Sequence, residues 1–330
     1  MHRHNAQPVP VKFRSNFVPV AVPNRRTIHP AAADCRSREL ATPLRSRAMF
    51  TPRYMDIYKL TPPTADPTCV LVEVPHAGLT IPTALEGIIY APERATKRDA
   101  DLYVDELFQN APEVGATMLS ACLSRYVVDL NRGPNDADRL TVDDYPRARR
   151  SRPRGVVWRM STLGQPVIPA PLSRAEFERR LDLYYRPYHQ ALEDQIRKLR
   201  ARFGKVVVIA AHSMPSHGPA ARGGAVERRA DIVPGTRGRT SADPRLIDFV
   251  DTHFRSSGLS VAHDTPYRGG WTTGHYGRPS HGQHVIQIEI NRDLYLDERT
   301  HERKLSTWPA LRASFQTLVR DLGHFARDLG

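Results

Sequence analysis

Two histidines stand directly after apolar runs that are typical of buried strands. Val-Leu-Val-Glu-Val-Pro precedes His76, and Val-Val-Val-Ile-Ala-Ala precedes His212. A third apolar run, Val-Ile-Gln-Ile, leads into Glu289. Two imidazoles and one carboxylate form a common open zinc site, in which water takes the fourth position. We therefore take His76 and His212 as candidate metal ligands. Glu289 is the candidate general base, because a carboxylate on a buried strand needs a partner or a function.

The third ligand of such a site must come from elsewhere in the chain. Asp101 is our first choice, and Asp99 and Asp105 are the alternatives. Residues 99–110 have helical spacing, so Asp101 and Asp105, four residues apart, would share one helix face. The spacing alone leaves the choice among the three carboxylates open.

Each candidate also has a structural interpretation. A histidine after a strand is often a hydrogen-bonded loop residue, and Glu289 could be the buried ion-pair partner of Arg125 or Arg292. Three further histidines lie together in a Gly-rich stretch and compete for the metal: His275, His281 and His284. A stretch of this composition is more typical of a shaped loop whose histidine and arginine contact substrate.

Strands and helices must alternate to position these residues. Apolar runs predict strands at 69–74, 116–122, 126–130, 205–211 and 284–290, and helical spacing predicts helices at 99–110, from Ser173 to Gly204, at 241–256 and at 306–328. Residues 133–172 are rich in Pro, Arg and Asp, and we expect a long, partly ordered excursion. The alternation predicts an α/β fold with helices on both faces of the sheet. Ligands bind at the carboxyl ends of strands in such sheets, so the candidates could converge.

Composition limits the class of protein. The 330 residues are 40% hydrophobic and 25% charged, which is typical of a globular protein. No apolar run approaches the roughly 20 residues that a membrane helix needs, so we expect no membrane partner. The three cysteines include no Cys-x-x-Cys pair, which disfavours a disulfide framework and a thiolate zinc site and suits a cytoplasmic location.

The net charge of +13 first suggests a basic anion-binding or nucleic-acid-binding protein. However, residues 1–50 hold nine basic and only two acidic residues. We interpret residues 1–48 as a disordered basic extension and residues 49–330 as one catalytic domain. The arginine run at 147–154 has no interleaved aromatic residues, so a nucleic-acid partner is disfavoured.

Several long motifs resemble the N-formylglutamate amidohydrolases. They are Val-Pro-His-Ala-Gly (74–78), Asp-Ala-Asp-Leu-Tyr-Val-Asp (99–105), Ser-Arg-Tyr-Val-Val-Asp-Leu-Asn-Arg (124–132), Ala-His-Ser (211–213), Gly-Gly-Trp-Thr-Thr-Gly-His-Tyr-Gly-Arg-Pro (269–279) and Gln-Ile-Glu-Ile-Asn-Arg-Asp-Leu-Tyr (287–295). They occur in the family's order. The resemblance implies a mixed central sheet of the zinc carboxypeptidase-like (phosphorylase/hydrolase-like) class, with helices on both faces.

The resemblance also implies a reaction. One Zn²⁺ per chain, held by His76, His212 and a carboxylate for which Asp101 stays our first choice, would serve hydrolysis of an N-acyl amino acid such as N-formylglutamate, a small-molecule substrate of histidine degradation. Glu289 would activate water, and Arg125 would polarise the scissile carbonyl. Asn131 and Arg132 would bind the substrate carboxylate, and His275 and Arg278 its distal group. A zinc carboxypeptidase or a deacylase of another N-acyl amino acid is the alternative.

Two positions depart from related sequences. The wider group takes a carboxylate ligand three residues after the first histidine, where this chain has Leu79. The formylglutamate family shares that lack. Leu102-Tyr103 stands where family members favour Trp-His, a difference that would alter the substrate pocket.

Overall fold

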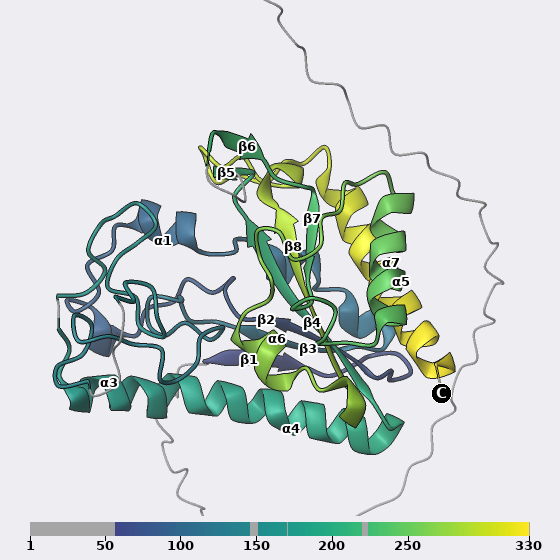
Figure 1. Cartoon of the computed structure of the whole chain (residues 1–330), viewed down its shortest axis with the longest axis horizontal. Helices are drawn as coiled ribbons and strands as arrows, with labels where there is room; N and C mark the ends of the chain where they lie inside the picture. Colours follow the sequence, from purple (N-terminus) through teal and green to yellow (C-terminus); the bar gives the residue numbers. More distant parts are fainter. Residues whose placement is uncertain (1–56, 146–150, 170, 220–223, 330) are drawn as a thin grey trace, which may run out of the picture. The chain divides into compact units, whose positions relative to one another are not determined.

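A six-stranded mixed sheet lies at the centre of the described part of the chain (Figure 1). The computed structural model describes residues 57–145, 151–169, 171–219 and 224–329. The strand order is β1 (Tyr58–Thr61), β3 (Thr117–Ala121), β2 (Val70–Val74), β4 (Val206–Met214), β8 (Gln283–Asn291) and β7 (Ile232–Gly235). The four inner strands are parallel, and the edge strands β1 and β7 are antiparallel to their neighbours. The predicted mixed α/β sheet is confirmed.

Helices lie on both faces of this sheet, as predicted. The chain forms α1 (Glu93–Asp99), α2 (Val104–Leu107), α3 (Arg174–Arg180), α4 (Arg186–Phe203), α5 (Pro244–Ser256), α6 (Trp271–Tyr276) and α7 (Trp308–Asp328). Short 3₁₀ turns occur at Thr83–Leu85, Ala111–Val114, Pro279–His281 and Arg292–Leu294. The strands β5 (His217–Pro219) and β6 (Val226–Arg228) pair separately from the main sheet. In Figure 1, α4 runs along one side of the sheet, and α5 and α7 pack together on another.

The alternation of side chains along the strands divides the apolar core in two. Val207 and Ile209 of β4 join the core that holds the apolar residues of α5 and α7, whereas Val206 and Val208 join the core that holds those of α4. Because both faces of these strands are buried, their sequences are continuous apolar runs. By the same alternation, the side chains of His212 and Glu289 lie on the face of the sheet that α4 covers.

The long predicted helix forms with the expected ends. The Ser173 hydroxyl accepts a hydrogen bond from the Glu176 backbone N–H, which caps the first turn. A π-helical segment, Leu181–Tyr185, joins α3 to α4. Gly204 ends α4 with a φ of 75°, a left-handed conformation that glycine adopts without strain.

Two predicted elements are wrong. Residues 99–110 do not form one helix, because α1 ends at Asp99, Ala100 is extended and Tyr103 takes a left-handed φ of 62°. Residues 126–130 form turns rather than a strand, and their apolar side chains pack into the α4-side core without a strand partner. Both errors fall on segments that carry site residues.

The described residues all belong to one compact unit, Asp56–Gly330. The predicted disordered extension at residues 1–48 lies outside the described residues. No helix in the described part of the chain is long and apolar enough to cross a membrane.

Candidate metal and catalytic site

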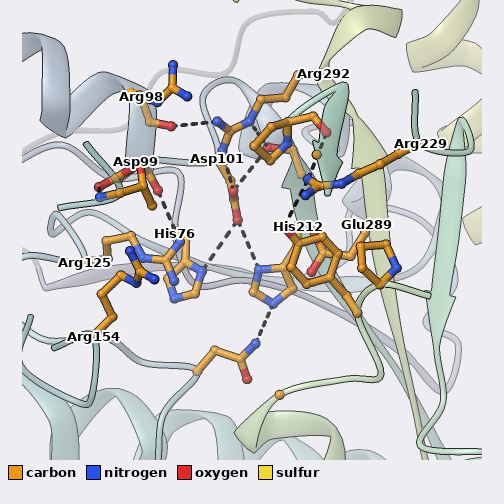
Figure 2. Close-up of a pocket in the computed structure, with 18 of the residues that line it drawn as sticks. His76, Arg98, Asp99, Asp101, Arg125, Arg154, His212, Arg229, Glu289 and Arg292 are labelled. Atoms are coloured by element: carbon orange, nitrogen blue, oxygen red, sulfur yellow. Dashed lines mark hydrogen bonds and ion pairs between the residues drawn. The ribbon is translucent and has the colours of Figure 1, made fainter. Parts of the chain in front are cut away.

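The carboxyl ends of β2, β4 and β8 bring the predicted residues together. His76 follows β2 by two residues, and His212 and Glu289 are register partners on the parallel strands β4 and β8. Figure 2 shows Asp101 facing both His76 and His212, with Glu289 beside His212. His212 lies inside β4 rather than after it, because the strand continues to Met214.

His76, Asp101 and His212 form a group that could hold a metal ion. All three side chains are buried. Asp101 Oδ2 lies 3.1 Å from His212 Nδ1 and 3.5 Å from His76 Nδ1. Ligands at zinc bond lengths of 2.0–2.2 Å in tetrahedral geometry stand about 3.4 Å apart, so these separations fit.

The protonation of His76 supplies an independent test of the fit. Its Nε2–H donates to Asp129 Oδ1 over 2.8 Å, so the neutral ring carries a lone pair on Nδ1. Nδ1 is buried without a hydrogen-bond partner and faces the Asp101 carboxylate. A lone pair facing a carboxylate is unfavourable unless a proton or a cation lies between them. A metal-ligating histidine that gives its other N–H to a carboxylate is a common arrangement.

Asp101 is held so that one oxygen faces the histidines. Its other oxygen, Oδ1, accepts hydrogen bonds from Ser213 Oγ and Arg292 Nη2, each over 3.1 Å. Its backbone N–H donates to the carbonyl of His76 over 3.0 Å. Although burial acts to raise its pKa, the hydrogen bond from His212 is the largest effect that holds the pKa of Asp101 well below its usual range. The carboxylate is therefore ionised, as a metal ligand must be.

The alternative ligands lie in other networks. Asp99 accepts hydrogen bonds from Tyr126 Oη over 2.6 Å and from the backbone N–H of Thr162 over 2.9 Å. Asp105 is on α2, and burial raises its pKa. His284 stands near the start of β8, beside Val207, at the opposite end of the strands from His212. Among the described residues, none of these belongs to a group that could hold a metal.

Asp129 is a fully buried carboxylate that positions two site residues. Besides His76, it accepts the Nε–Nη2 edge of Arg125, over 3.2 and 2.7 Å, and Trp158 Nε1 over 2.9 Å. Its Oδ1 also accepts the backbone N–H of Asn131 over 3.0 Å. The Arg125 guanidinium stacks on Trp158, with Cζ 4.5 Å from the ring centroid. Arg125 therefore lines the cavity in a fixed orientation.

Glu289 is not an ion-pair partner of Arg125 or Arg292 within the described residues, since these pair with Asp129 and Asp101. Its Oε1 instead accepts Gln287 Nε2 over 2.7 Å. Burial raises the pKa of Glu289 to about 7, although His212 acts in the opposite direction. A carboxylate with a pKa near neutrality suits a general base.

Asn131 and Arg132 differ in their availability to a substrate. The Asn131 side chain is already engaged: Nδ2 lies 3.1 Å from His212 Nε2 and donates to Gln287 Oε1, and Oδ1 accepts Thr272 N–H. Its geometry favours positioning His212 over direct binding of a carboxylate. Arg132 lines the cavity, and its Nε is buried without a hydrogen-bond partner. It is free to receive an anion.

The remaining predicted substrate residues lie apart from the three-residue metal group. The main cavity, of about 850 Å³, is lined by His76, Asp101, His212 and Glu289 among others. His275 stacks on Trp271 and lines a neighbouring cavity of about 400 Å³, which shares Arg132 with the first. Arg278 is exposed after α6 and lines neither cavity. The structure thus lends Arg278 no support as a substrate ligand.

The sequence alone does not identify Gln287 and Ser213 as positioning residues, and it suggests Arg292 only as a partner of Glu289. Gln287 precedes Glu289 by two and therefore points to the same face of β8, which was a usable signal. Ser213 and Arg292 meet Asp101 only through the tertiary fold, and no local pattern indicates that contact.

Known proteins resemble this chain in both sequence and fold. A sequence model of the N-formylglutamate amidohydrolase family matches residues 68–296. N-formylglutamate deformylases of Pseudomonas aeruginosa and Pseudomonas putida are 30% and 31% identical over 268 and 239 residues. These alignments cover 78% and 69% of the chain and 94% and 82% of the two relatives.

Solved structures agree with the sequence matches. The crystal structure of N-formylglutamate amidohydrolase from Ralstonia eutropha JMP134 matches with a TM-score of 0.76 at 29% identity, covering 83% of this chain and 99% of that one. A protein from Agrobacterium tumefaciens at 22% identity, with a TM-score of 0.59, shares the fold. The matches define a hydrolase that acts on amide C–N bonds. The chain belongs to the N-formylglutamate amidohydrolase family.

Proposed function

We propose that this protein hydrolyses the N-formyl group of an acidic amino acid, N-formylglutamate first, with a divalent metal held by His76, Asp101 and His212. The observation that carries the proposal is the buried His–Asp–His group beside Glu289. The names of the relatives, deformylases and amidohydrolases of N-formylglutamate, supply the substrate class. Two imidazoles and a carboxylate make Zn²⁺ the first choice of metal.

The chain's own residues account for proton transfer. When bound, a zinc ion would lower the pKa of a water molecule and polarise a carbonyl oxygen. Glu289 accepts the proton of the attacking water and later delivers it to the departing amine nitrogen. Gln287 holds the Glu289 carboxylate for both transfers. The single carboxylate can perform both steps because its pKa of about 7 permits either protonation state near neutrality.

Other residues orient the substrate and stabilise charge. Arg125, fixed by Asp129 and Trp158, presents a guanidinium to the oxyanion that develops on the acyl carbon. Arg132 binds the substrate α-carboxylate, which a guanidinium fork fits bidentately. Asn131 holds His212 in place.

Metal analysis combined with a substrate panel tests the proposal. The protein is assayed on N-formyl, N-acetyl and N-succinyl forms of glutamate and of a neutral amino acid, before chelation, after chelation and after Zn²⁺ is restored. We expect N-formylglutamate to give the highest kcat/KM, with activity lost on chelation and recovered with zinc. Full activity of the metal-free protein would contradict the metal assignment, and preference for another acyl group would redirect the substrate assignment.

Two matched variants test the third ligand. Asp101→Asn removes the carboxylate that faces both histidines, so we expect the purified protein to lose bound zinc. Asp105→Asn makes the same chemical change on α2, outside the metal group, and should retain zinc. Equal zinc content in the two variants would mean that Asp101 is not a ligand.

A further inference from the structure

Arg229 is a cavity-lining arginine that the proposed reaction does not use. It follows β6 and lines the main cavity with Tyr267 and Glu289. In Figure 2, Arg229 lies on the Glu289 side of the metal group, and Arg125 and Arg154 lie on the His76 side.

The Arg229 guanidinium is held in one orientation. Nη1 donates to the carbonyl of Pro215 over 3.0 Å and lies 3.2 Å from Tyr267 Oη. Cζ lies 5.3 Å from the centroid of the Tyr267 ring. A Cβ atom at Gly218 would come within 2.0 Å of Arg229 Nη2, 2.6 Å of Cζ and 2.9 Å of Nε, so the guanidinium packs closely against the backbone of this glycine. The charge is thus placed before any ligand arrives.

One edge of this fixed guanidinium has no acceptor. Nε is buried without a hydrogen-bond partner, and within the described part of the chain Nη2 has none either. No carboxylate of the described residues forms an ion pair with Arg229. In this same structure, the Nε–Nη2 edge of Arg125 donates both of its hydrogen bonds to a carboxylate, at Asp129 Oδ2. The free edge of Arg229 therefore matches the requirements of a carboxylate.

The cavity holds a second such arginine. Arg132 also has a buried Nε without a partner and forms no ion pair within the described residues. Both guanidinium groups line the cavity that contains His212 and Glu289. A substrate with one carboxylate would satisfy only one of them, whereas a dicarboxylate would satisfy both. Leaving a half-buried charge without a partner is unfavourable, which favours the dicarboxylate.

We infer that Arg229 binds the side-chain carboxylate of the substrate and thereby sets the preference for an acidic amino acid, while Arg132 binds the α-carboxylate. This inference rests on the proposed function and adds the residue that selects the side chain. Arg229 does not take part in proton transfer. Its removal should change which substrate is cleaved and leave the chemistry intact.

A pair of isosteric substrates tests the assignment. The kcat/KM ratio of N-formyl-L-glutamate to N-formyl-L-glutamine is measured for the zinc-loaded wild type, Arg229→Met and Arg229→Lys. Losing a hydrogen bond between charged groups corresponds to about 10- to 100-fold, so we expect Arg229→Met to lower the ratio by that factor. The lower ratio should come from a fall in kcat/KM for N-formyl-L-glutamate, with kcat/KM for N-formyl-L-glutamine unchanged. Arg229→Lys keeps the charge without the fork and should fall between the other two.

The matched control is Arg268→Met, which removes an exposed arginine from the same cavity lining. It should leave the ratio unchanged. An equal loss of ratio in Arg268→Met would mean that net charge sets the preference, and an equal loss on both substrates in Arg229→Met would mean a structural role; either result overturns the assignment. Because the ratio is taken within one preparation, partial misfolding cancels. A wild type that fails to cleave N-formylglutamate would instead defeat the proposed function.

Discussion

At the scale of the residue, Glu289 is the group whose protonation controls the proposed reaction. Burial raises its pKa to about 7, with His212 acting the other way. A general base must be deprotonated, so we expect kcat/KM to fall as the pH drops through about 7, approaching tenfold per unit below it. Glu289→Gln should abolish this limb and reduce kcat by about 10²- to 10⁴-fold. A pH profile of the zinc-loaded proteins measures both effects.

The control for Glu289 is another carboxylate of the same cavity. Glu298 lines the cavity and accepts the backbone N–H of Ser216, but it is not the strand neighbour of His212 as Glu289 is. Glu298→Gln should keep the acidic limb of the profile. Near-normal turnover by Glu289→Gln with its zinc still bound would disprove the role of Glu289.

Residue types could be predicted from the sequence, but their partners could not. His76, His212 and Glu289 were recognisable because ionisable residues at the ends of apolar strands are exceptional. Asp129, by contrast, sits in a segment that resembles a strand, and its contacts with His76 and Trp158 join positions 53 and 29 residues away. Such pairings depend on how the loops fold over the sheet, and no local spacing encodes them.

At the scale of the element, α4 supports the site through one buried histidine. In the neutral ring of His189, Nε2–H donates to the carbonyl of Leu130, and Nδ1 accepts the hydroxyl of Tyr276 on α6. Protonation would leave Nδ1 without a lone pair for that hydroxyl. Burial lowers the pKa of His189 to about 4. Nδ1 therefore accepts the Tyr276 hydroxyl, and links α4 to α6 in this way, only while His189 is neutral.

This tie predicts acid-sensitive stability. The folded pKa of about 4 lies below the unfolded value of 6.5. The contribution is thus complete above about pH 6.5 and is lost as the pH falls toward 4, amounting to about 3 kcal/mol. Urea unfolding across this range should show a shallower decline in the free energy of unfolding for His189→Asn than for the wild type. His281→Asn, which changes an exposed histidine, should decline like the wild type; matching slopes in all three would contradict the role of His189.

Element prediction succeeded where burial is continuous and failed where the chain turns. The runs that form β2, β4 and β8 are apolar on both faces. The long helix up to Phe203 has an N-cap residue and one continuous stripe of apolar side chains, so it was also predictable. Residues 99–110 have helical spacing too. However, the backbone N–H of Asp101 donates to the carbonyl of His76, and its side chain accepts a hydrogen bond from Arg292. Those tertiary contacts interrupt the helix between α1 and α2. Helix propensity gives way there because the buried charge requires its partners.

At the scale of the whole molecule, the net charge of +13 is unevenly distributed. Residues 1–50 hold nine basic and two acidic residues, and the family match begins only at residue 68. In the catalytic unit, many arginines are neutralised by neighbouring carboxylates, as Arg125 is by Asp129 and Arg292 by Asp101. Those left free in the cavity suit a small dianion. The basic character therefore does not require a polyanionic partner.

A shortened chain that begins at Met49 tests whether the positive charge serves a polyanionic partner or is not needed for function. It keeps β1 and every site residue, so we expect kcat/KM for N-formylglutamate and the melting temperature to match those of the full chain within error. Any salt-sensitive binding of nucleic acid by the full chain should disappear, since the slope of affinity against salt reports the number of phosphate contacts. Fluorescence anisotropy with a labelled duplex at several salt concentrations measures this slope. If the shortened chain bound the duplex with an unchanged slope, the catalytic unit itself would carry a polyanion site; if it lost turnover while remaining folded, residues 1–48 would contribute to catalysis.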